Sequence, residues 1–149
     1  MSYANRLQTY KVSAVHTASP GALVVMLFDG AIKYLNIALK TFDSTDPLEF
    51  NLTIHTNLTK TQEIVRELNA ALDPEKGGAL GNRMSSLYEY FDRRLHEANM
   101  KKDKAIIEEV LRHISGLRDA WNQSLLKESQ AQADKNRPPT PSDGLSLLG

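Results

Sequence analysis

Three prolines, Pro20, Pro47 and Pro74, divide most of the 149-residue chain into long segments. Residues that cap helices well precede the first two, Ser19 before Pro20 and Asp46 before Pro47. Proline is tolerated at the first helical position because its missing N–H would have no partner within the helix. Between the prolines the apolar residues recur at helical spacing, and no segment alternates with the two-residue period of a strand. The chain is therefore predicted to be all-α.

The same boundaries predict four long helices, at about 20–42, 47–72, 80–98 and from 103 to beyond 125. Connections of about 2–8 residues make neighbouring helices run antiparallel, which defines an up-down four-helix bundle. Residues 4–16 predict a short N-terminal helix or cap. We expect one domain over residues 1–129, since single domains cluster at about 100–150 residues. Residues 130–149 are polar and rich in proline, so we expect a disordered tail.

The composition argues against several classes of protein. Eighteen basic residues balance 18 acidic ones, so no net charge of the kind that attracts nucleic acid is present. The chain contains no cysteine, which excludes disulfides and thiolate metal sites. We see no signal peptide and no segment that approaches the ~18 apolar residues of a membrane span. We therefore expect a cytosolic protein that binds no nucleic acid and inserts into no membrane.

The sequence lacks the residue patterns of metal centres and enzymes. A di-iron bundle needs Glu-x-x-His, whereas Glu109 is followed by Arg112 at the third position and His113 comes one residue too late. The glycine-rich stretch at 77–81 lacks the Gly-Lys-Ser/Thr ending of a phosphate-binding loop and reads as a turn between helices. We predict no catalytic residue, no metal ligand and no cofactor.

The first long helix carries more apolar residues than a bundle core requires. Its polar positions, spaced by four, three and four residues, form one narrow row: Asp29, Lys33, Asn36 and Lys40. Almost every other position is apolar, although a bundle helix needs only about three apolar positions per heptad. Another segment must cover the apolar residues of this helix that the bundle core does not need.

Two coverings are compatible with the sequence. Residues 4–16 could fold back as a lid that carries Leu7 and Tyr10, or a partner's apolar segment could bind in a groove. The two coverings are compatible if a partner can displace the lid. A short lid stabilises the folded protein by only a few kcal/mol before ordering costs, so a longer partner segment could compete with it. Tyr10 could anchor the lid or contact a partner, and Tyr88 and Tyr90 pose the same question on the third helix.

Several stretches, in order along the chain, resemble one family. Ala18-Ser19-Pro20 followed by Met26-Leu27-Phe28-Asp29-Gly30-Ala31 resembles the opening signature of the FliS family, the cytosolic flagellin-export chaperones of the bacterial flagellar type III system. Leu72-Asp73-Pro74-Glu75-Lys76-Gly77-Gly78 and Leu87-Tyr88-Glu89-Tyr90-Phe91 fit the same family, as does Ile107-Glu108-Glu109-Val110 with Trp121. The chain departs from the family at Gly21-Ala22, where acidic residues are frequent.

The resemblance implies a function without catalysis. A chaperone of this family binds the disordered C-terminal segment of flagellin, prevents its polymerisation in the cytosol and delivers it to the flagellar export gate; a co-chaperone or regulatory protein is a further partner. The resemblance points to a binding groove formed by the lid and two helices: Leu7, Tyr10, Leu23, Leu27, Ile32, Tyr88 and Tyr90. A structural or adaptor bundle that binds a different amphipathic helix remains the alternative.

The tail is a second departure, because the family commonly ends soon after the tryptophan. Its last residues include Leu145, Leu147 and Leu148, in a pattern similar to the end of many flagellins. One hypothesis is that this patch occupies the chaperone's own groove, in the same chain or in a swapped dimer. The alternative is a solvated tail with a chance cluster of leucines.

Overall fold

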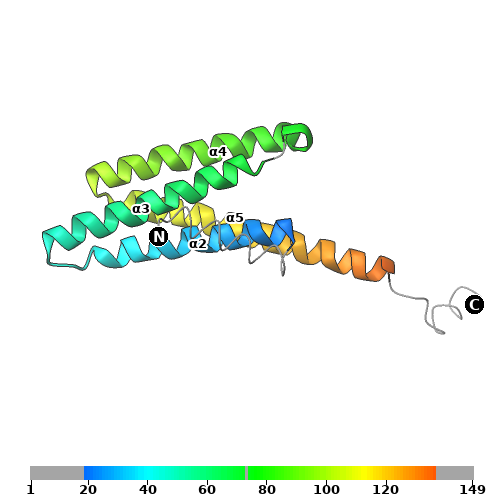
Figure 1. The fold of residues 1–149 in the computed structure, drawn as a ribbon, viewed down its shortest axis with the longest axis horizontal. Helices are drawn as coiled ribbons and strands as arrows, with labels where there is room; N and C mark the ends of the chain where they lie inside the picture. The colour runs from blue at the N-terminus through cyan, green and yellow to red at the C-terminus, as the bar shows by residue number, and fades with distance from the viewer. Residues whose placement is uncertain (1–18, 73, 137–149) are drawn as a thin grey trace, which may run out of the picture.

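A computed structural model describes residues 19–72 and 74–136 (Figure 1). They form four helices: α2 (Pro20–Thr41), α3 (Pro47–Ala70), α4 (Pro74–Lys101) and α5 (Lys104–Asn136). The described residues contain no strand. The prediction of an all-α helical bundle is confirmed. The predicted cap at 4–16 and the leucine patch at 145–148 lie outside the described residues.

Local capping explains where the helices begin. The Ser19 hydroxyl accepts a hydrogen bond from the Ala22 N–H at 3.2 Å, and the Asp46 carboxylate accepts one from the Leu48 N–H at 3.0 Å. These bonds satisfy donors that the first turn of a helix leaves without a partner. The Ser19-Pro20 and Asp46-Pro47 pairs therefore begin α2 and α3, as predicted.

α4 begins earlier than predicted and is interrupted once. It starts at Pro74, and Gly78 then breaks the helical backbone with φ 50° and ψ −137°. This left-handed φ favours glycine, which has no Cβ to clash. The helix ends where Lys102 takes a positive φ of 51° and the Asp103 N–H donates to the Ala98 carbonyl at 3.0 Å. Such a bond closes a helix C-terminus.

The four helices pack as a ring around one core. α2 packs against α3 and α5, and α4 completes the ring by packing against α3 and α5 (Figure 1). Each helix contributes fully buried apolar side chains: Phe28, Leu35, Ile54, Leu58, Phe91, Leu95, Ile107 and Ile114. A polar contact also joins α3 to α4, because the Gln62 amide donates to the Asp92 carboxylate at 2.9 Å.

One expectation about α2 needs correction. This helix is long and apolar enough to cross a membrane, although the sequence was expected to contain no such segment. The four polar residues in its row are spread along the helix and leave the rest of it apolar. Because α2 packs between α3 and α5 and buries residues such as Phe28 and Leu35 completely, its apolar character serves the bundle.

α5 continues beyond the domain boundary expected at residue 129 and ends at Asn136. Residues 130–136 contain no glycine or proline and include good helix formers, so local propensity sustains the helix until the prolines that follow. Every residue from 126 to 136 is exposed. In Figure 1 this part of α5, drawn in orange, projects beyond the start of α2.

A close approach of α5 to the start of α2 explains Gly21. A Cβ placed at Gly21 would lie 2.3 Å from the Leu125 Cδ2 atom. Glycine therefore lets Leu125 pack directly on the α2 backbone, in a space that a larger side chain would occupy. The missing acidic residue at this position leaves room for the end of α5.

Candidate functional site

The structure divides the apolar residues of α2 into two groups. Most are buried or pack against the core, but Leu23, Met26 and Ile37 remain partly exposed and lie outside the core cluster. Together with Gly30 they recur at spacings of three, four and seven residues, which places them on one face of the helix. We call Leu23, Met26, Gly30 and Ile37 the α2 stripe.

The α2 stripe runs beside α3. A Cβ at Gly30 would lie 3.2 Å from the Ile64 Cδ1 atom, so this face of α2 closely approaches α3. At the far end of the stripe, Ile37 lines an open cavity of about 580 Å³ together with Thr41 and Thr53. From Leu23 to Ile37 the stripe extends about 21 Å along the helix axis, at 1.5 Å per residue.

A row of exposed polar residues borders the α2 stripe. Asp29, Lys33 and Lys40 each lie three residues after a stripe residue, and all three are exposed. Asp29 accepts a hydrogen bond from the Arg118 guanidinium of α5 at 2.9 Å. An apolar surface with a polar border fits an apolar face of a bound segment and leaves its polar face in water.

The structure does not gather the predicted groove residues in one place. Leu23 lies on the α2 stripe, whereas Leu27 and Tyr88 are only 6% and 2% exposed and belong to the core. Ile32 is partly buried and also packs against the core. Burial raises the pKa of Tyr88 to about 12. While the bundle is closed, the side chains of Leu27 and Tyr88 are too buried to form a binding surface.

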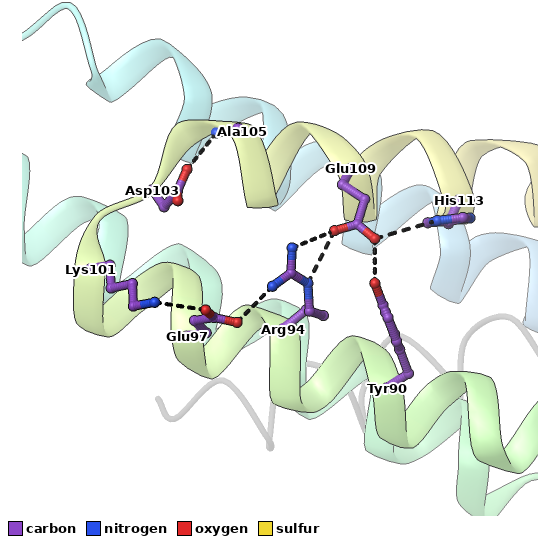
Figure 2. A network of polar contacts seen from close by, with 8 residues as sticks. All are labelled: Tyr90, Arg94, Glu97, Lys101, Asp103, Ala105, Glu109 and His113. Atoms are coloured by element: carbon purple, nitrogen blue, oxygen red, sulfur yellow. Dashed lines mark hydrogen bonds and ion pairs between the residues drawn. The ribbon is translucent and has the colours of Figure 1, made fainter.

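Tyr90 belongs to a polar network that joins α4 to α5 (Figure 2). Its hydroxyl donates to the Glu109 carboxylate. The Arg94 guanidinium donates to the same carboxylate at 2.8 and 3.1 Å and to Glu97 at 2.6 Å, and Lys101 donates to Glu97 at 2.9 Å. The Tyr90 hydroxyl therefore supports the bundle, and a partner at this position would contact the ring.

Hydrogen bonds lower the pKa of Glu109, first from the Tyr90 hydroxyl and then from the Arg94 guanidinium. A carboxylate with a lowered pKa stabilises the fold at pH values above its unfolded pKa. That contribution is lost as the pH falls through the folded pKa. We therefore expect acid to weaken the contact between α4 and α5.

We expect Glu109→Gln to lower the free energy of unfolding at pH 7 by about 1 kcal/mol, because an uncharged amide replaces the charge-assisted acceptor. The deficit should shrink at pH 3, which lies below the usual pKa of glutamate of about 4.3, because there the unfolded chain is protonated and the parent loses part of the stabilisation from its charged carboxylate. Urea unfolding at both pH values measures the effect, and Glu108→Gln on the exposed side of α5 is the matched control. A deficit of equal size at pH 3 would contradict this role of the charge.

The residues singled out from the sequence did not include Met26, Gly30 and Ile37 of the α2 stripe. The sequence did contain an indication of them. Each lies three residues before a residue of the exposed polar row, Asp29, Lys33 or Lys40. In the described part of the chain, no group of three or more His, Cys, Asp or Glu side chains could hold a metal ion. The fold defines the class of protein as an all-α helical bundle, with partly exposed apolar residues along one face of α2.

Comparison with known proteins gives the family. The family model described as "Flagellar protein FliS" matches residues 3–128. A flagellar secretion chaperone FliS of Bacillus subtilis is 34% identical over 128 residues, which cover 86% of this chain and 92% of the relative. The Salmonella typhimurium chaperone of the same name is 40% identical over 118 residues, covering 78% and 84%. The chain belongs to the FliS family, and its residues 129–149 extend beyond the matched region.

Proposed function

We propose that this protein is a cytosolic flagellar secretion chaperone that binds the C-terminal segment of flagellin on the α2 stripe. The observation that carries the proposal is that Leu23, Met26 and Ile37 are left partly exposed on a helix whose other large apolar residues are buried or pack against the core. Its relatives are named as flagellar secretion chaperones, which supports a client from the flagellar export pathway. We call the bound flagellin segment the client.

The stripe suits an apolar segment that must not assemble. A client of about 14 helical residues, or about six extended ones, would span the 21 Å of the stripe. Its apolar side chains would contact Leu23, Met26 and Ile37, while its polar face would remain in water. Covering the client's apolar face hides a surface that would otherwise polymerise, and a segment held only by such contacts can be released without chemistry.

Binding of the isolated client tests the proposal. We expect a peptide with the C-terminal sequence of flagellin to form a one-to-one complex with the full chain, measured by calorimetry, while a scrambled peptide of equal composition does not bind. Absence of the complex at moderate salt would refute the flagellin proposal and favour an adaptor bundle with a different helical partner. The preformed complex is then the reagent for capture of the export gate component and of any co-chaperone.

A further inference from the structure

We propose that the C-terminal leucines, Leu145, Leu147 and Leu148, bind the N-terminal half of the chain's own α2 stripe and compete with the client. The inference rests on the proposed function. These residues belong to the segment that continues after the FliS match ends at residue 128. Within the described residues, all four helices contribute to one core cluster, whereas Leu23 and Met26 of the α2 stripe lie outside it.

α5 determines where the segment starts. The contact between Leu125 and Gly21 puts residue 125 level with the beginning of α2. The exposed helix from 126 to 136 then carries the chain about 16 Å beyond that point. The segment that follows Asn136 must therefore turn back toward the bundle to meet any apolar surface on it.

Chain length decides which part of the stripe is within reach. Leu145 is nine residues after Asn136, so it can lie up to about 30 Å away, and Leu148 about 40 Å. Along the bundle axis Met26 is about 24 Å from Asn136, whereas Ile37 is about 40 Å away. The leucines therefore reach Leu23 and Met26 with slack in the chain, and they reach Ile37 only when fully extended.

The C-terminal leucines and the α2 stripe are chemically compatible, because both are apolar. Residues 144–149 carry no charged side chain, so the leucines can contact Leu23 and Met26 without burying one. A few apolar contacts bind weakly between separate molecules. A tether of this length raises the effective concentration to the millimolar range, which makes even weak contacts competitive. We expect the client's apparent affinity to be lowered about threefold to tenfold.

The test replaces Leu145, Leu147 and Leu148 by Ser in the full chain and measures client binding by calorimetry. The variant should bind the client about threefold to tenfold more tightly than the parent. The matched control, Ser142→Ala with Ser146→Ala, changes the same segment without removing leucine and should bind as the parent does. Equal affinity of the triple-leucine variant and the parent would overturn the competition.

A second measurement does not use the client. The methyl NMR signal of Met26 should shift between the parent and the triple-leucine variant, while that of Met100, exposed on α4, should stay in place. An unshifted Met26 signal would overturn the contact. If the client binds neither protein but the Met26 signal shifts, the proposed function fails while the contact between the leucines and the stripe stands.

Discussion

Met26→Asp is expected to weaken binding of the client by at least about tenfold while leaving the bundle folded. Met26 is only partly buried and lies outside the core cluster, so a carboxylate there stays hydrated in the free protein. When the client covers the α2 stripe, that carboxylate must lose water without gaining a partner, which costs more than about 1.4 kcal/mol, the equivalent of tenfold in affinity.

Calorimetric titration gives the affinity, and thermal unfolding shows whether the bundle is intact. Met100→Asp is the matched control, since Met100 is 74% exposed at the end of α4 and lies away from the stripe. Unchanged affinity in Met26→Asp would exclude the α2 stripe as the client site. An equal loss in the control would indicate an effect of charge alone.

Phe91→Ala should reduce the free energy of unfolding by about 3–5 kcal/mol. Phe91 is fully buried, and its ring centroid lies 6.4 Å from that of Tyr88, 6.1 Å from Tyr90 and 5.8 Å from His113. Truncation would leave a cavity among these rings. The loss is a large fraction of the roughly 5–15 kcal/mol that holds a typical domain folded.

Urea denaturation measures this effect, with Leu80→Ala as the control. Leu80 lies on the same helix but is 67% exposed, so its truncation should change the free energy of unfolding by no more than about 0.5 kcal/mol. Similar costs for the two variants would contradict the position of Phe91 in the core.

Local signals were enough to predict the bundle. Ser19-Pro20 and Asp46-Pro47 mark helix starts through hydrogen bonds that each segment makes with itself. Helical spacing of apolar residues does not depend on the partner helices either. The C-terminal end of α5 was predicted too early, because the polar composition after residue 129 was read as disorder although its residues favour a helix.

The surface could be predicted only in part. The surplus of apolar residues on α2 was visible in the sequence, but which of them stay exposed depends on where α3 and α5 pack. Leu23 and Leu27 are equally apolar and one turn apart, yet only Leu27 is in the core. Tyr88 and Tyr90, two residues apart, also differ in environment. Tyr88 is buried in the core, whereas the Tyr90 hydroxyl donates to Glu109 across the interface between α4 and α5.

A client bound to the α2 stripe, as proposed above, would couple the lifetime of the protein to the supply of that client. A ligand that binds only the folded state lowers the unfolded fraction in proportion to its own occupancy. The unfolded fraction is what cellular proteases degrade. Because α2 packs between α3 and α5, a client bound to the stripe would favour the folded bundle, and unoccupied chaperone would be removed faster than occupied chaperone. Abundance of the protein would then follow flagellin synthesis without any separate regulator.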